Sequence, residues 1–355
     1  MLEAGIKKIL HEGTVIPAHP LALNKYRQLD EKRQRGLTRY YMSSGAGGVA
    51  IGVHTTQFAI HDPEINLYED VLAIAADEIS HAKRDTPFIK IAGICGPTDQ
   101  AMAEAEKAVK NGYHLGLLSM GGLKGWSEKE ILKRTEEVSR MIPLFGFYLQ
   151  PSVGGRIFSF DFWEGFAAIE NVHAIKVAAF NRYQTLDVMR AVCFSDRCNE
   201  IAMYTGNDDN IIVDLLTSYR FTVKGKERQK RFVGGLLGHW AVWTQKAVAL
   251  LEEIRSCRAN KGLGLEKLLT KANAVTDMNA AIFDSKNGFH GCIPGIHEVL
   301  QRQGLLEGRW CLNPMEDLSV GQLEEIHRVY NYYPELTDDP FVKAFLREEQ
   351  RSFSM

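Results

Sequence analysis

The sequence predicts a (β/α)8 TIM barrel followed by a C-terminal helical extension, and three observations lead to this prediction. Over the first 250 residues, short apolar runs alternate with longer amphipathic segments, which is the pattern of strands alternating with helices. Eight such runs indicate a parallel sheet with right-handed crossovers, and 355 residues are enough to close it into a barrel. No GxGxxG motif follows the first run, so an open dinucleotide-binding sheet lacks its main signal.

The elements of the barrel follow from these patterns in chain order. Ser127 and Glu130 have the spacing of a capping box, which predicts the start of one helix. The predicted strands are Gly13–Ala18, Gly48–Val53, Phe88–Ile94, His114–Ser119, Leu144–Leu149, His173–Ala178, Glu200–Thr205 and Phe232–Leu237. The predicted helices between them are Asp30–Ser43, Leu67–Ala82, Thr98–Asn111, Glu128–Met141, Phe160–Glu170 and Tyr183–Ser195.

The strand pattern stops after Glu253, and the remaining segments have a helical pattern. Helices are predicted at Leu265–Phe283, Gly295–Gln303 and Val320–Tyr332. The chain therefore divides into a barrel over residues 1–253 and a helical extension over residues 254–355. No long linker separates the two, so we expect the extension to pack on the barrel.

Composition narrows the class of protein. The hydrophobic fraction is 45%, the charged fraction is 24% and the formal net charge is −2, so nothing favours binding to nucleic acid or to an anionic membrane. The basic run Lys224–Arg231 is short and is interpreted as a solvated loop. Six scattered cysteines without a CxxC pair predict neither a zinc site nor a disulfide framework. Without an N-terminal apolar signal or a membrane-length apolar stretch, we expect a cytoplasmic protein.

Lys176 is the most informative residue, because it lies in the middle of an apolar strand. On that strand it shares a face with Ala174 and Ala178, which leave room beside its stem. Burial disfavours the ammonium form, so a neutral amine becomes accessible near neutral pH and can form a Schiff base with a carbonyl substrate. The alternative is a lysine that reaches water at a strand end or pairs with a buried acid.

Three further segments end at the same face of the predicted barrel, where chemistry gathers in this fold. Tyr148 is predicted to face inward with Gly146, one strand before the lysine; the alternative is a core tyrosine. Thr55 and Thr56 end the second strand and can hold a carboxylate or relay a proton. Gly206 ends the seventh strand and lets a ligand approach the backbone, although turn chemistry explains it equally well.

The ordered set of Thr55-Thr56, Tyr148-x-x-Pro151, Ile175-Lys176 and Gly206-Asn-Asp-Asp resembles the dihydrodipicolinate synthase and N-acetylneuraminate lyase superfamily. The resemblance runs from about Gly13 to the segment Asn313–Ser319 and includes the tyrosine-to-lysine spacing (176 − 148 = 28 residues). It implies a class I, Schiff-base-forming aldolase or lyase, built as a barrel with a C-terminal helical extension. Such enzymes act on pyruvate or a related 2-oxo acid, with an aldehyde as the second partner, and need no metal or organic cofactor. The resemblance also implies a homo-oligomer, either a dimer or a tetramer.

The resemblance implies a role for each matching residue. Lys176 would attack the keto carbon, and Tyr148 would shuttle protons during dehydration and C–C bond chemistry. Thr55 and Thr56 would bind the carboxylate, with Thr55 also passing protons to Tyr148. Gly206 would offer a backbone carbonyl to the substrate.

The chain departs from the family pattern at several positions. His54 replaces the glycine before the threonine pair and is expected to line the pocket. The arginine that dihydrodipicolinate synthases carry five residues after the tyrosine is Val153 here, and Arg156 is the nearest candidate for binding a substrate carboxylate. The stretch 119–123 lacks the tyrosine that those enzymes lend to a neighbouring subunit. The acceptor and the direction of the reaction therefore stay open.

Three alternatives remain at this point. The first is a 2-oxo-acid hydro-lyase of the same superfamily. The second is a non-catalytic barrel that binds an oxo acid, motivated by the altered threonine loop. The third is a metal-dependent hydrolase, because His19, His54 and His239 lie near predicted strand ends, although no acidic partner stands at a recognisable spacing.

Overall fold

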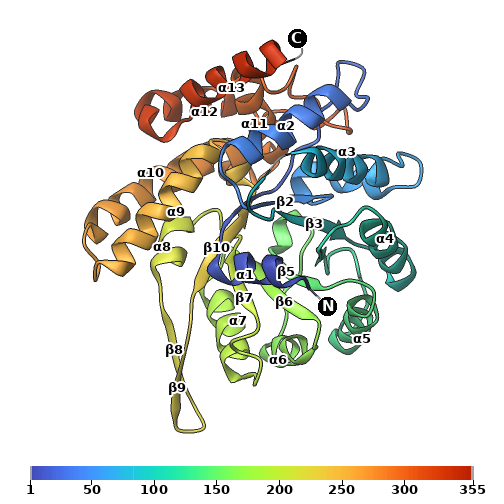
Figure 1. Ribbon diagram of the computed structural model, residues 1–355, viewed down its shortest axis with the longest axis vertical. Coiled ribbons are helices and arrows are strands. Elements are labelled where there is room, and N and C mark those ends of the chain that lie inside the picture. Colours follow the sequence, from blue (N-terminus) through green and yellow to red (C-terminus); the bar gives the residue numbers. More distant parts are fainter. Residues whose placement is uncertain (1, 83, 353–355) are drawn as a thin grey trace.

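The computed structural model describes residues 2–82 and 84–352 and confirms the predicted TIM barrel with C-terminal helices (Figure 1). The eight strands are all parallel and lie in the order β1-β10-β7-β6-β5-β4-β3-β2. The His19 amide donates to Ala50 O at 2.8 Å, which joins the ends of β1 and β2 and closes the ring. The strands are β1 (Val15–Pro17), β2 (Gly48–Ile51), β3 (Ile89–Ile94), β4 (Leu115–Leu118), β5 (Leu144–Leu149), β6 (Val172–Ala178), β7 (Ala202–Thr205) and β10 (Phe232–Leu237).

Helices cover the outside of this ring, and each predicted helix of the barrel is present. The predicted helices are α2 (Glu31–Ser43), α3 (Tyr68–His81), α4 (Thr98–Lys110), α5 (Glu128–Ser139), α6 (Phe160–Ala168) and α7 (Arg182–Phe194); the short α8 (Ile211–Leu216) was not predicted. The Ser127–Glu130 capping box is present at the start of α5. The first helix, α1 (Ala4–Glu12), was not predicted; its Ile6 and Leu10 join the apolar cluster inside the barrel.

Two apolar cores result from the alternation of side chains along the strands. The inner core fills the barrel, and the outer core lies between the strands and the helices. On β6, Ala174 and Ala178 belong to the inner core while Ile175 and Val177 belong to the outer one, as the sequence pattern predicted. This alternation determines which side chains can reach a site at the barrel mouth.

The basic run near residue 224 is not a loop, so that interpretation was wrong. It forms β9 (Lys226–Lys230), which pairs with β8 (Tyr219–Val223) in an antiparallel hairpin that extends from the barrel (Figure 1). Arg228 donates to Cys193 O and Ser195 O at 2.8 and 2.7 Å, and Lys230 donates to Cys198 O. The basic side chains therefore bind carbonyls around the end of α7, which charge patterning alone does not reveal.

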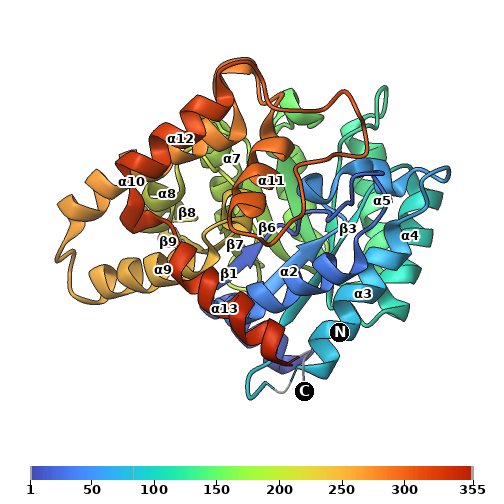
Figure 2. The same cartoon turned by 90° about the horizontal axis from the view of Figure 1, so that it is seen from above.

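The extension contains α9 (Thr244–Ala259), α10 (Leu265–Phe283), α11 (Cys292–Arg302), α12 (Gln322–Tyr332) and α13 (Asp339–Ser352), of which the first and last were not predicted. Helix α9 runs through the domain boundary placed after Glu253. Figure 2 shows α11 and the chain that follows it lying across the barrel strands. In the described part of the chain, no helix combines the length and apolar character needed to cross a membrane. All six cysteines carry free thiols.

Candidate active site

The candidate site is a cavity at the carboxyl ends of the barrel strands, covered by the C-terminal extension. Its volume, taken as the space open to the centre of a water molecule, is about 40 Å3. A ligand that enters without moving side chains must therefore be small. The lining residues are Ala18, Val53, His54, Thr55, Phe147, Leu149, Gln150, Val153, Lys176, Ala178, Phe180, Asp208, Gly238, Phe283, Phe289 and Cys292.

Lys176 enters this cavity from β6 and is only 7% exposed. Its ammonium nitrogen lies 4.5 Å from the centre of the Phe147 ring, and these two residues are register partners on β5 and β6. Burial lowers the pKa of the lysine to about 8, and the nearby Asp208 carboxylate acts in the opposite direction. The predicted removal of this lysine from water is confirmed, and a free amine becomes accessible near neutral pH.

Asp208 is the acidic group of the cavity, and it lies beyond the end of β7. Its Oδ1 accepts a hydrogen bond from the His239 amide at 2.8 Å. Burial raises the pKa of the carboxyl to about 7, although this hydrogen bond and Lys176 both favour the charged form. The cavity thus contains one amine and one carboxyl whose pKa values are shifted toward each other.

Gly206 lies directly against the lysine stem, where a side chain would not fit. A Cβ at this position would come within 2.5 Å of Lys176 Cε and 2.9 Å of Ala178 Cβ. The glycine is therefore required by the close approach of the end of β7 to β6. Gly206 itself is not among the residues that line the cavity.

The threonine pair forms a short 3-10 helix with His54, at residues His54–Thr56, and its two members have different environments. Thr55 and His54 line the cavity. Thr56 does not: its hydroxyl donates to His19 O at 2.7 Å and accepts from the amides of Gly52 and Val53. Thr56 holds the loop together, and Thr55 alone presents a side chain to a ligand.

His54 is a neutral imidazole near neutral pH. Burial, together with the positive charge of Lys176, lowers its pKa to about 4. The residue is therefore able to accept a hydrogen bond from a ligand as well as to donate one.

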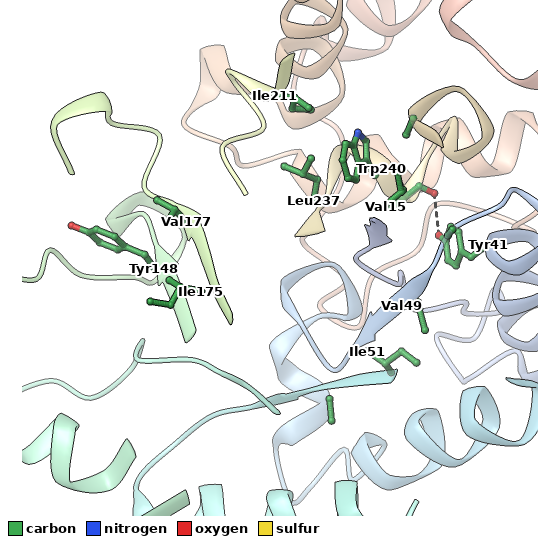
Figure 3. Close-up of a cluster of buried hydrophobic side chains, with 14 of the residues drawn as sticks. Val15, Tyr41, Val49, Ile51, Tyr148, Ile175, Val177, Ile211, Leu237 and Trp240 are labelled. Atoms are coloured by element: carbon green, nitrogen blue, oxygen red, sulfur yellow. Dashed lines mark hydrogen bonds between the residues drawn. The ribbon is translucent and has the colours of Figure 1, made fainter. Parts of the chain in front are cut away.

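The inward orientation predicted for Tyr148 is wrong. Tyr148 belongs to the outer core, with its ring centre 5.0 Å from that of Trp163 and 6.1 Å from that of Phe158. Figure 3 shows it beside Ile175 and Val177, the β6 residues that point away from Lys176. Its buried hydroxyl has no hydrogen-bond partner within the described residues. The structure thus does not bring this phenol to the lysine.

The physical reason lies in the packing of α6 against β5. Helix α6 presents Trp163 and Phe166 to the strand, and a Cβ on Gly146 would come within 2.5 Å of the Phe166 ring. Gly146 and Tyr148 consequently face the helix, where the glycine makes room and the tyrosine joins the aromatic cluster. The other face of β5 carries Phe147 into the cavity.

Arg156 is also not brought to the cavity. Its guanidinium donates to Trp126 O at 2.8 Å and lies 5.2 Å from the centre of the Phe158 ring. None of the described lining residues is an arginine, so the cavity lacks the group that the resemblance associates with a second carboxylate.

The sequence reasoning missed most of the residues that enclose the cavity. Asp208 lies two residues after Gly206 in the quoted Gly206-Asn-Asp-Asp motif at a strand end, so the rule that barrel chemistry gathers there could have assigned it a role. Phe283, Phe289 and Cys292 belong to the extension, and no strand-end signal marks them. Their arrival at the barrel mouth depends on how the extension folds back.

The three histidines considered for a metal site do not form a ligand group. His19, for example, is bonded to Pro20 O at 2.7 Å and to Thr38 Oγ1 at 3.0 Å. Within residues 2–82 and 84–352, the side chains of metal-ligand type that lie close together are those of His61, Cys95 and Glu104. They already bond to one another, with 2.9 Å between His61 Nδ1 and Glu104 Oε1.

Solved structures show what the chain is similar to. No protein-family model and no curated protein matches it. Dihydrodipicolinate synthase from Oceanobacillus iheyensis matches with a TM-score of 0.72 and 16% identity, covering 93% of this chain and 99% of that chain. N-acetylneuraminate lyase from Fusobacterium nucleatum, complexed with pyruvate, matches with a TM-score of 0.70 and 18% identity, covering 93% and 98%. The chain shares the fold of these enzymes. A putative dihydrodipicolinate synthetase from Pseudomonas aeruginosa also matches, with a TM-score of 0.70 and 13% identity, covering 91% and 99%.

Proposed function

We propose that the protein is a Schiff-base-forming aldolase or lyase of the dihydrodipicolinate synthase and N-acetylneuraminate lyase superfamily, acting on pyruvate or a related 2-oxo acid. The observation that carries this proposal is Lys176, a buried lysine with a lowered pKa in a cavity at the barrel mouth. A neutral amine in such a place is the nucleophile that captures a ketone as an imine. The similarity to a lyase complexed with pyruvate supports this choice of substrate.

The remaining polar groups fit a small 2-oxo acid. Thr55 and His54 can hydrogen-bond the carboxylate or the carbonyl oxygen beside the lysine. Thr56 contributes by fixing this loop through His19 O. The iminium formed on Lys176 then serves as the electron sink for the carbanion at the adjacent carbon, so a C–C bond can form or break there.

The second partner is an uncharged aldehyde with an apolar body, and cleavage to that aldehyde is the reverse reaction. Four phenylalanine rings enclose the cavity, and no described lining residue is an arginine. A second carboxylate would therefore be buried against aromatic rings, at a cost in desolvation. The four rings belong to Phe147, Phe180, Phe283 and Phe289.

Borohydride reduction in the presence of pyruvate tests the proposal. The wild-type protein should gain a covalent adduct at Lys176, found by peptide mass spectrometry, and Lys176→Ala should gain none. Wild-type protein that stays unmodified under conditions that saturate a control aldolase would exclude the Schiff-base mechanism.

A pyruvate-binding barrel without catalysis is the second candidate, and the position of Tyr148 favours it. The phenol that the resemblance makes the proton carrier packs in the outer core. Binding of pyruvate by calorimetry without a trapped adduct would identify this alternative. A trapped adduct together with condensation or cleavage of an aldehyde partner would identify the enzyme.

A further inference from the structure

Imine chemistry in this cavity needs a group that moves protons, and Tyr148 does not reach it. Attack of an amine on a ketone gives a carbinolamine, whose hydroxyl must be protonated before it leaves as water. The carbon next to the imine must then lose a proton. On β5 the residue beside Lys176 is Phe147, which can do neither. Another lining residue must serve.

The described lining residues with a titratable or hydroxyl side chain, apart from the lysine, are His54, Thr55, Asp208 and Cys292. Burial raises the pKa of the Cys292 thiol well above its usual value, so it is a poor acid. Thr55 is a hydroxyl of ordinary chemistry, whose weak contact with His19 O is 3.4 Å long. His54 is held in the neutral form by burial and by Lys176. Asp208 is the one carboxyl among them.

The position of Asp208 fits proton transfer at the lysine. The side chain follows Gly206 by two residues, and the missing side chain of that glycine lets the end of β7 lie against the lysine stem. The His239 backbone amide donates a hydrogen bond to Asp208 Oδ1 at 2.8 Å. Among the described residues, none donates a hydrogen bond to Oδ2. The carboxyl and the amine influence each other's charge, yet the described residues include no ion pair between them within 4 Å. Both groups line the same cavity without forming a direct ion pair.

We propose that Asp208 is the catalytic acid and base of this site, in the role that the resemblance assigned to Tyr148. This inference rests on the proposed Schiff-base function and specifies how it operates. Asp208 begins as the neutral carboxyl. The neutral amine of Lys176 forms the N–C bond to the keto carbon as the C=O π bond breaks, and Asp208 gives its proton to the resulting alkoxide and takes the surplus proton from nitrogen, which restores the neutral carboxyl. The protonated carboxyl then protonates the hydroxyl, which leaves as water as the iminium forms. The resulting carboxylate removes a proton from the adjacent carbon to give the enamine.

Exchange of the methyl protons of pyruvate in D2O measures this last step without knowledge of the second partner. Proton NMR of the wild-type protein should show catalysed loss of the methyl signal. Asp208→Asn keeps an oxygen acceptor for the His239 amide but cannot take up a proton, so the exchange rate should fall by about 10²–10⁴-fold. Asp209→Asn is the matched control, because Asp209 lies outside the cavity and 3.6 Å from Arg182. It should exchange within about threefold of the wild-type rate, because the Asp209 charge is a minor cause of the raised Asp208 pKa.

Chemical rescue separates catalysis from a structural role. Asp208→Ala removes the carboxyl, and added formate should restore part of the exchange in proportion to its concentration. A merely structural role for Asp208 predicts no recovery. Borohydride trapping with pyruvate is measured in parallel on every variant.

The outcomes of the two measurements are distinct. An adduct in the wild-type protein with wild-type exchange in Asp208→Asn would overturn the role of Asp208 and leave the proposed function standing. The absence of both adduct and exchange in the wild-type protein would overturn the proposed function and this inference with it. Adduct formation with exchange lost in Asp208→Asn and recovered by formate in Asp208→Ala supports both.

Discussion

At the scale of single residues, the site depends on what small neighbours allow a lysine to do. Ala174 and Ala178 flank Lys176 on its own face of β6, and Gly206 approaches its stem from the next strand. None of them offers the ammonium group a hydrogen bond from its side chain. Burial therefore disfavours the charged form of Lys176 and lowers its pKa. A lowered pKa is the property that an imine-forming amine needs.

This environment predicts a pH dependence for adduct formation with pyruvate. The free amine attacks and the protonated Asp208 carboxyl, with a pKa of about 7, supplies the acid, so the rate should rise about tenfold per pH unit below pH 7 and fall above the lysine pKa of about 8. The Asp208 carboxylate raises that lysine pKa, so its removal in Asp208→Asn should move the lysine pKa to lower pH. Quenched mass spectrometry across pH 5–10 measures both curves. A lysine pKa near 10.5, the ordinary value, would contradict burial of the amine.

Gly206→Ala tests the close approach at the lysine stem. The added methyl group would lie 2.5 Å from Lys176 Cε, so we expect a loss of about 1–3 kcal/mol in the free energy of unfolding and slower adduct formation. Gly36→Ala is the control, because its Cβ would meet only Arg39 Nη2 at 3.9 Å in helix α2. That change should stabilise the protein by about 0.5–1 kcal/mol. Urea unfolding of both variants checks these signs, and an unchanged Gly206→Ala would refute the steric argument.

At the scale of elements, the packing of α6 against β5 determines which β5 side chains reach the barrel mouth. A strand offers two faces, and the aromatic residues of α6 occupy the one that carries Gly146 and Tyr148. The same packing turns Phe147 toward the lysine. A helix on the outside of the barrel thus decides which β5 side chain is available to a substrate on the inside.

Tyr148→Phe is the direct test of this orientation. Its hydroxyl is buried without a hydrogen-bond partner in the described structure, so removing it should change the free energy of unfolding by less than about 1 kcal/mol. Trapping with pyruvate and methyl-proton exchange should both stay near the wild-type rate. A loss of exchange by a factor of ten or more would place the phenol in the reaction and contradict the orientation described for β5.

At the scale of the whole molecule, a buried carboxylate ties the extension to the barrel helices. Asp338 precedes α13 and accepts hydrogen bonds from Tyr40 of α2 at 2.7 Å and from the Gln245 amide of α9 at 3.2 Å. Its other oxygen accepts from Gln303, just after α11, at 2.8 Å. Segments separated by up to 298 residues therefore meet at one side chain. The extension that closes the cavity is held in place partly from this point.

Asp338→Ala should lower the free energy of unfolding by about 2–4 kcal/mol, because several buried donors would lose their acceptor at once. Asp339→Ala is the matched control: that side chain is exposed and accepts one hydrogen bond, from Gln303. It should cost less than about 1 kcal/mol. Denaturant titrations of the two variants compare the costs, and equal values would show that the buried carboxylate is not a structural centre.

The sequence by itself determined the barrel and the lysine. Eight apolar runs at regular intervals have few ways to bury both faces, so the parallel barrel followed from periodicity alone. Lys176 was identifiable because a lysine inside an apolar strand is uncommon and needs either a route to water, a charged partner or a function. Gly206 and Thr55 followed from the rule that strand ends carry the chemistry of this fold.

The tertiary structure alone decided which side chains share the cavity with that lysine. The direction of Tyr148 depended on the aromatic residues of α6, which no spacing within β5 encodes. Phe283, Phe289 and Cys292 reached the site because the extension folds across the barrel mouth. The pKa values of Lys176 and Asp208 depend on a burial that both layers create together. Periodicity reports how one segment meets its nearest layer, whereas a site is formed by segments distant in sequence that the folded chain brings together.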